Sequence, residues 1–522
     1  MKDMKHNWLR RWTNLFCVGC SIGLLTHFGE KVAAQETKPA VAQQAAELGS
    51  TMTLEELRNG GKPKPAVDEG PKARLITSAP EPIPALRYRF WPSEQELIAG
   101  DAKVYFFRTA VSFNSTNRDK QINELFLKWE GEREAGRDPS PIEIRNALQA
   151  YRLQFDELET MSLCDHQDLD MQLRNLRGSD VYAILLEEVQ ISRNIAKLLR
   201  WRMAAQAADG DWDGFSRSAR TGYRLACLIS SGDTLIHNLV GIAITAIITD
   251  EVQRAAQHKG APNFYWALAS LPRPMFNLRP ALELETSIVE RVFPFLADCR
   301  KGPLPESTVQ TYWESMQKTF REVDQNFMAT VGIVGALSVE EAKANLLKRG
   351  WKSESFKEYP VMQLVLIDLD DTMREQGNRA MKFFLIDDAV ADKARAKEYA
   401  EFEKWLSSNN SLASQVARLL FPALMQVSNA ARRVDYILNG AMTKEAIRMH
   451  VDQTGTLPDS LEALEPVPAL LNPYTGNSFE LVVTPTQLKN IVEVALKGEV
   501  PGIAPVYANW VSPFLIEINA KK

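Results

Sequence analysis

The strongest constraint on the fold is an apolar stretch near the middle of the chain, from Thr234 to Gln257. Nothing else in the sequence is as apolar for as long. Two amphipathic segments precede it, and the turn Asp209–Asp213 between them predicts a helical hairpin. We therefore predict that Ala196 to Gln257 forms a buried central helix with a hairpin folded against it.

Polar residues within the apolar stretch argue against a membrane span. Asn238, Thr245 and Thr249 recur on one side of the predicted helix, where they can meet a neighbouring helix or water. His237 is in line with apolar residues, which is more typical of a hydrogen-bonded core histidine than of a metal ligand. We expect this helix to pack against protein, and an enclosed apolar ligand or lipid is an alternative.

Apolar residues recur at helical spacing through most of the chain, which predicts a mostly α-helical protein. With 45% hydrophobic residues, the 522-residue chain can bury a large core. We predict an irregular multi-helix domain over residues 87–450. Its helices are expected at residues 93–113, 118–135, 141–161, 180–208, 213–229, 234–257, 280–299, 307–329, 338–348, 360–385, 392–406 and 414–450.

The two ends of the chain differ from this body. After residue 450, a short helix, the turn Asn472–Asn477 and strand-like runs at 478–484, 504–507 and 513–518 predict a small α+β cap over residues 451–522. Residues 35–86 are rich in proline and polar residues, which predicts a disordered linker.

The first 34 residues have the layout of a secretory signal. Basic residues precede an apolar run from Leu15 to Leu25, and Val32–Ala34 provides small residues before Gln35. The apolar run is shorter than the ~20 residues of a transmembrane helix. We predict export to the periplasm or cell envelope, with an uncleaved N-terminal membrane anchor as the alternative.

The charge balance bears on the kind of partner. The formal net charge is -5, and loss of residues 1–34 would remove five basic and two acidic residues, leaving -8. This sign argues against an electrostatic nucleic-acid surface.

The cysteines do not form a recognisable framework. Two of the five lie in the signal-like segment, and Cys164, Cys227 and Cys299 are scattered, which predicts buried thiols with at most one bridge. The run Cys164–Asp170 gathers metal-ligand residue types, but an acidic loop between helices has the same composition. We predict no metal and no cofactor.

One motif has a specific enzymatic interpretation. Four apolar residues followed by Asp368, Asp370 and Thr372 match the way in which haloacid-dehalogenase-like phosphatases present a nucleophile, a general acid/base and a magnesium site. Such a site requires a strand that ends at Asp368. The apolar stripe formed by Met362, Leu366, Leu369 and their successors instead predicts an amphipathic helix.

Two further segments have possible interaction roles. The turn Asp209–Asp213 resembles that of a tetratricopeptide hairpin, although no second copy occurs at a period of ~34 residues. After the apolar helix, Phe264, Tyr265, Trp266, Arg273 and Arg279 combine aromatic anchors with arginines that can bind carboxylates. This second group is a candidate docking surface, and an internal brace between helices is the alternative.

Several segments together resemble a known family. They are residues 209–213, 234–243, 263–268 with 271–274, 278–283, 359–363, and 457–461 with 472–476. In this order they resemble a family of exported, largely uncharacterised helical proteins of planctomycete-type bacteria. The resemblance implies a helical fold and export, and it implies no catalytic residues.

We therefore expect an exported, non-catalytic helical scaffold or docking protein with a protein partner. Contact with a membrane is expected only through an uncleaved N-terminus. The alternatives are a magnesium-dependent phosphatase that uses Asp368 and Asp370, and a domain that binds an apolar ligand.

Overall fold

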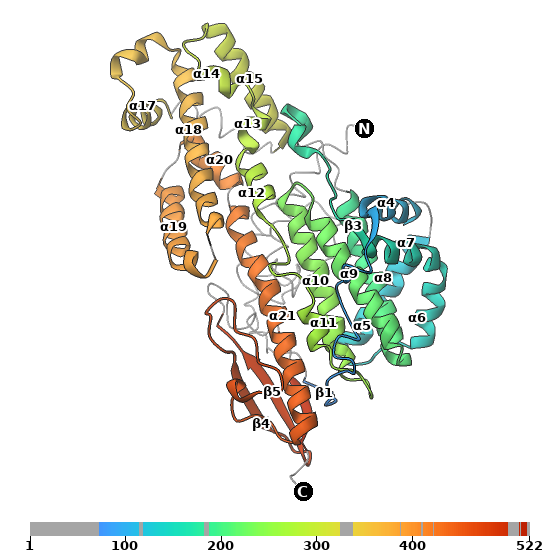
Figure 1. Cartoon of the computed structure of the whole chain (residues 1–522). Helices are drawn as coiled ribbons and strands as arrows, with labels where there is room; N and C mark the ends of the chain where they lie inside the picture. Colours follow the sequence, from blue (N-terminus) through green and yellow to red (C-terminus); the bar gives the residue numbers. More distant parts are fainter. Residues whose placement is uncertain are drawn as a thin grey trace, which may run out of the picture.

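The molecule is mostly helical, with a small sheet at its C-terminal end, as the sequence predicted. Its overall shape is elongated (Figure 1). The computed structural model describes residues 73–113, 118–181, 187–323, 338–386, 388–408, 411–420, 422–499, 511 and 513–518. The predicted signal segment, most of the predicted linker and the predicted strand at 504–507 lie outside the described residues.

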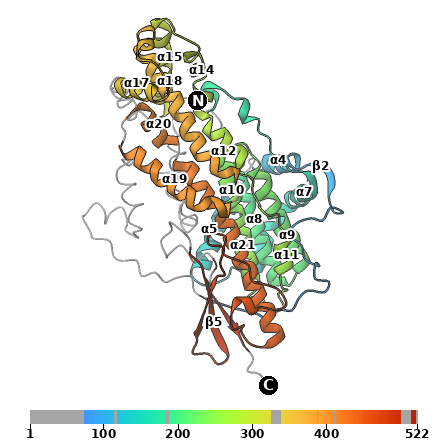
Figure 2. The same cartoon turned by 60° about the vertical axis from the view of Figure 1, so that its left-hand side comes forward.

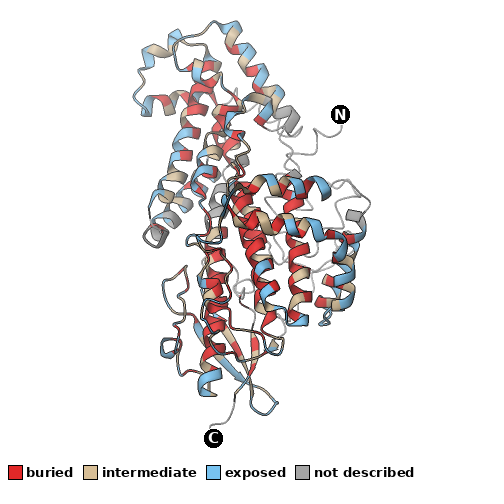
Figure 3. Ribbon diagram, turned by 45° about the vertical axis from the view of Figure 1, so that its right-hand side comes forward, coloured by how far each residue is buried: buried red, intermediate tan, exposed pale blue. Residues whose placement is uncertain are grey.

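A helical body surrounds α10 (Leu235–Ala255), the predicted central helix. It packs against α8 (Glu187–Asp209), α9 (Trp212–Ser230) and the long α21 (Pro422–Thr454). Most of its residues are buried, so its apolar length is explained by packing inside the protein. Figure 3 shows that buried residues gather on the faces where the helices meet. The other helices of the body are α4 (Ala102–Phe113), α5 (Arg118–Glu134), α6 (Pro141–Leu148), α7 (Arg152–Leu163) and α11 (Tyr265–Ala269).

Glycines allow α9 and α10 to approach closely. A Cβ added at Gly222 would lie 2.5 Å from Ile248 Cδ1, and one added at Gly241 would lie 2.6 Å from the Ala226 carbonyl oxygen. Side chains at these two positions would force the helices apart, since helix separation depends on the residues at the contact.

The turns around α9 and α10 follow local chemistry. Gly210 has a φ of 71°, which glycine adopts without strain, and Asp211 then caps α9 by accepting from the Gly214 amide. Thr234 and His237 form a capping box at the start of α10. The predicted hairpin is confirmed as a packed helix pair, but its tetratricopeptide character is not.

A second group of helices forms a lobe beyond the body. The lobe is centred on α18 (Val361–Met381), which packs against the short α12, α14 and α17 and against α20. Its elements are α12 (Arg279–Thr286), α13 (Ile288–Val292), α14 (Leu296–Cys299), α15 (Glu306–Val323), α17 (Val339–Lys348), α19 (Asp388–Ser408) and α20 (Leu412–Leu420).

Several predicted helix boundaries are wrong, and the helix expected at residues 141–161 is broken by a 3-10 turn into α6 and α7. The single helix expected at residues 280–299 is three short helices, because the chain leaves helical geometry at Ser287 and before Pro294. The helix expected from Ser93 begins only at Ala102, because residues 98–101 form β2 (Ile98–Asp101), which pairs with β3 (Cys164–His166).

The C-terminal sheet has the strand order β1-β6-β5-β4 and lies beside one end of α21 in two views (Figures 1 and 2). Strands β4 (Glu480–Pro485) and β6 (Phe514–Glu517) were predicted, whereas β5 (Ile491–Lys497) was not. Strand β1 (Arg74–Ile76) pairs in parallel with β6 from within the predicted linker.

The prediction of a disordered linker is therefore wrong for residues 73–86. We call residues 74–81 the strap, since they fasten the N-terminal part of the described chain to distant elements. Ile76 and Ala79 are buried, and the Thr77 amide donates to the Ala256 carbonyl at 2.9 Å. The strap thus joins the C-terminal sheet to the end of α10, a contact that no local pattern reveals.

Candidate functional site

The structure places two of the predicted docking residues inside the protein. Phe264 is fully buried, its ring stacks on Phe215 with centroids 5.3 Å apart, and its amide donates to Glu445. Tyr265 is buried and donates its hydroxyl to the Pro468 carbonyl at 2.9 Å. The prediction that these two residues lie on an exposed docking surface is wrong, because their rings are part of the core.

The other three predicted docking residues make contacts within the chain. Trp266 donates its indole N–H to Glu81 of the strap at 2.6 Å, and Arg273 donates to Asn439 of α21 at 2.9 Å. Arg279 pairs with Glu283 one turn away on the exposed face of α12. The contacts of Trp266 and Arg273 fit the brace alternative, whereas the Arg279 pair lies within one helix.

The two aspartates of the phosphatase motif lie in the interior of α18. Asp368 accepts from Arg349 at 2.6 Å, and Asp370 pairs with Arg300 and Arg374. Burial raises the pKa of Asp368 above its ordinary value, against the pull of Arg349. Because a helix runs through Asp368, the strand that the phosphatase interpretation requires is not there.

The acidic run after α7 begins as strand β3 and continues as a structured loop. Asp165 accepts from the Gly100 amide at 3.0 Å, and Asp168 accepts from the Asp170 amide at 2.9 Å. The thiols of Cys164, Cys227 and Cys299 are all free. In the part of the chain that the structure describes, no group of three His, Cys, Asp or Glu side chains is placed to hold a metal.

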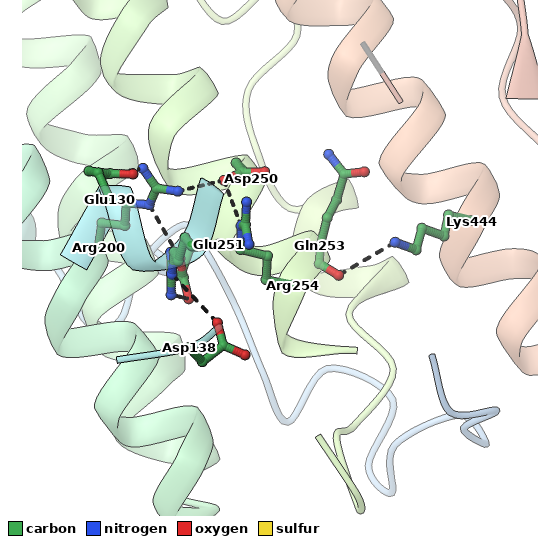
Figure 4. A network of polar contacts seen from close by, with 9 residues as sticks. Glu130, Asp138, Arg200, Asp250, Glu251, Gln253, Arg254 and Lys444 are labelled. Carbon is green, nitrogen blue, oxygen red and sulfur yellow. Dashed lines mark hydrogen bonds and ion pairs between the residues drawn. The ribbon is translucent and has the colours of Figure 1, made fainter. Parts of the chain in front are cut away.

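A group of linked charged side chains lies where α5, α8 and α10 meet (Figure 4). At its centre, Glu251 accepts from both terminal nitrogens of Arg133, at 2.6 and 3.0 Å. The guanidinium of Arg133 also lies 4.2 Å from the ring centre of Trp201. Two hydrogen bonds and an aromatic face thus compensate for the desolvation of this arginine.

A second arginine extends the cluster. Arg200 of α8 donates to Glu130 of α5 at 2.8 Å and to Asp250 of α10 at 2.9 Å. Asp250 also accepts from Arg254 at 2.9 Å. We call Glu130, Arg133, Arg200, Asp250, Glu251 and Arg254 the ionic cluster.

The pKa shifts of three members, Asp250, Glu251 and Arg254, all favour their charged forms. Burial acts to raise the pKa values of Asp250 and Glu251, but the surrounding arginines outweigh it and hold both below their ordinary values. Burial likewise acts to lower the pKa of Arg254, yet Asp250 and Glu251 raise it. The carboxylates are therefore committed to ion pairs, which makes them poor general acids or bases.

Lys444 of α21 lies beside this cluster, and its contacts compensate less fully for the desolvation of its ammonium group. It donates to the Gln253 carbonyl at 3.5 Å, and its ammonium lies 5.1 Å from the ring centre of Phe514. Burial lowers the pKa of Lys444 to about 8. Because Gln253 is in the last turn of α10, the lysine supplies positive charge at the negative end of that helix.

The opposite end of α10 holds a second set of titratable groups. His237 is fully buried and its Nε2 lies 3.1 Å from Glu188 Oε1, which confirms the predicted hydrogen-bonded core histidine. Burial raises the pKa of Glu285 to about 7, while the Leu235 amide and Arg291 act in the opposite direction. Both ends of the central helix are thus held by side chains from other elements.

The arrangement joins helices firmly and offers little chemistry. Apart from the partly exposed Asp250, its charged side chains are buried or half-buried among helices, and all are bonded to one another, so the cluster connects three elements as a cross-brace. Sequence reasoning missed it because its partners are far apart in the chain. The one available signal was the Asp250–Glu251 pair at the end of an apolar helix, since buried acids need cationic partners.

Comparisons with protein families, with curated proteins and with solved structures found no match to this chain.

Proposed function

We propose that the chain is an exported, non-catalytic scaffold whose braced helical body docks a protein partner. The observation that carries the proposal is the strap. It binds the N-terminal part of the described chain to the C-terminal sheet through β1 and β6, to α10 through Thr77, and to α11 through Glu81. A tether that precedes the strap would therefore be coupled directly to the body.

The internal bracing supports the same role. Ion pairs join α5, α8 and α10 in the body, and Arg300 and Arg349 join α18 to neighbouring segments of the lobe. Such cross-links restrain helices relative to one another, which preserves the shape of a surface that a partner must recognise. Export and the resemblance to exported planctomycete-type proteins remain predictions that accompany this proposal.

The two alternatives lack support from the geometry. The phosphatase interpretation needs a strand ending at Asp368, and that residue lies within a helix. The apolar-ligand interpretation was motivated by α10, whose apolar side chains pack against α8, α9 and α21. A phosphatase assay with magnesium on wild type and Asp368→Asn is a direct check: an activity lost in the variant would overturn the proposal.

The location and the partner can be tested in one experiment. A photo-reactive amino acid is placed at exposed apolar positions, namely Val111 and Leu153 in the body and Leu385 in the lobe, which are 71%, 75% and 57% exposed. The full chain is expressed in its native cell, which is then fractionated and irradiated. The buried Phe215 is the control position.

The proposal expects the chain in the envelope fraction and a discrete protein adduct at one or more exposed positions, with none at Phe215. A chain that stays in the cytoplasm would contradict export. An envelope chain without a discrete adduct at any of the three positions would contradict docking at these surfaces.

A further inference from the structure

The strap occupies a binding site that the rest of the chain builds. Its backbone pairs with β6 over three residues, Arg74 with Phe514, Leu75 with Leu515 and Ile76 with Ile516. Arg448 of α21 is fully buried and donates its Nε to the Thr77 carbonyl at 2.7 Å. The Ala79 amide returns a hydrogen bond to the Arg448 carbonyl at 3.3 Å.

This site recognises an extended segment with a definite pattern. Ile76 and Ala79 are only 2% and 3% exposed, so the site takes a large apolar side chain and, three residues later, a small one. Arg448 also donates to the Ala261 and Pro262 carbonyls, which positions its guanidinium for the strap carbonyl. Main-chain pairing combined with side-chain selection is how sheet edges bind extended peptides.

The connection between the strap and the body lies on the surface. Ile83 is 90% exposed, and Pro84, Leu86 and Arg87 are exposed as well. The chain is buried again at Tyr88 and Phe90, whose rings pack on Phe264. An exposed connection between two buried segments can change direction without disturbing either of them.

We propose that the strap is an exchangeable strand, and that residues 74–79 of a second copy of this chain can replace it beside β6. The second copy is the occupant because its strap has the sequence that this site fits. After exchange, each strap would make with the second copy the contacts that it now makes within its own chain. The equilibrium between the exchanged and unexchanged forms would therefore depend on chain concentration and on the connection at residues 82–87.

Cross-linking between neighbouring strands can detect this exchange. Leu75→Cys and Leu515→Cys are made in separate full-length chains, with Cys17 and Cys20 replaced by serine in both. The chains are mixed, equilibrated and treated with a short thiol cross-linker. A chain that carries both substitutions should form an intrachain link, since the two positions are register partners.

A matched control comes from the same row of the sheet. Thr484 and Glu493 are register partners in β4 and β5, and Glu493 is in turn the partner of Leu515. Because β4 and β5 form a hairpin, mixed Thr484→Cys and Glu493→Cys chains should give only background interchain product. Thr77→Val, which removes the hydroxyl bond to Ala256, should accelerate exchange at the strap.

If the strap exchanges, the interchain product that links positions 75 and 515 should be several-fold more abundant than the product of the control pair. Excess synthetic peptide of residues 73–82 should suppress this product, and a scrambled peptide should not. A product no greater than the control would overturn the proposal, as would one that the peptide does not suppress. Absence of the intrachain link in the doubly substituted chain would overturn the β1–β6 placement itself.

Discussion

Glu251 of α10 accepts hydrogen bonds from both terminal nitrogens of Arg133 in α5, and both side chains are almost fully buried. The pair joins two helices that are far apart in the sequence, at the end of α10 nearest the strap. Because both charges are almost fully buried, each depends on the other for its stability.

We predict that Glu251→Ala lowers the free energy of unfolding by about 3–5 kcal/mol, since it leaves the Arg133 guanidinium buried without its main partner. Urea denaturation followed by circular dichroism measures this loss. Glu283→Ala is the control, because Glu283 forms an exposed pair with Arg279 within one helix, and its loss should cost less than about 1 kcal/mol. Equal effects of the two substitutions would contradict the role given to the ionic cluster.

The close approach of α9 and α10 predicts an unfavourable effect of a single added methyl group. Gly241→Ala should destabilise the protein by about 1–3 kcal/mol, because the Ala226 carbonyl that it would meet belongs to the helix backbone. Gly131→Ala in α5 meets nothing within 4 Å and should instead stabilise by about 0.5–1 kcal/mol. Thermal unfolding of both variants gives the signs, and a stabilising Gly241→Ala would refute this packing.

Glu285 predicts a pH dependence of stability. Its folded pKa of about 7 is above its ordinary value of 4.5, so its contribution is fully present below pH 4.5 and is lost as the pH rises through 7. Between these limits the loss is about 3 kcal/mol at most. Wild type should therefore weaken relative to Glu285→Gln between pH 4.5 and pH 8 in denaturant titrations. A difference between them that stays constant over this range would count against the raised pKa of Glu285.

Lys444 predicts the reverse trend in alkaline solution. Its folded pKa of about 8 is below its ordinary value of 10.5, so its contribution is present above pH 10.5 and is lost as the pH falls through 8. Relative to Lys444→Met, wild type should gain up to about 3 kcal/mol between pH 7.5 and pH 10.5. Unfolding midpoints across this range provide the test, and parallel curves for the two proteins would exclude burial of the ammonium.

Local patterns in the sequence predicted the helices well. The segment expected at residues 213–229 is α9 at Trp212–Ser230, because its apolar spacing and its Asp211 cap both lie within the segment itself. His237 was also interpreted correctly, since its surroundings on α10 are set by helical periodicity. Long helices with local start signals are the elements for which such reasoning is most reliable.

Features that depend on distant partners were not predictable in this way. Ile76 lies in a proline-rich segment, and its burial depends on Ile516 at the other end of the chain. The sequence around Phe264 predicts a surface anchor, but Phe215 and Phe90 enclose its ring. The ionic cluster was missed because the sequence does not show that Arg133 and Arg200 reach the carboxylates of α10.

The central claim is that the strap belongs to the fold and couples the N-terminal part of the described chain to the body. Hydrogen–deuterium exchange of the full chain tests this most directly at the Thr77 and Ala79 amides, which donate to the Ala256 and Arg448 carbonyls. Both amides should exchange far more slowly than in a free peptide of residues 73–82. Exchange at the rate of that peptide would show that residues 74–81 are a linker, and would contradict the coupling of the strap to the body.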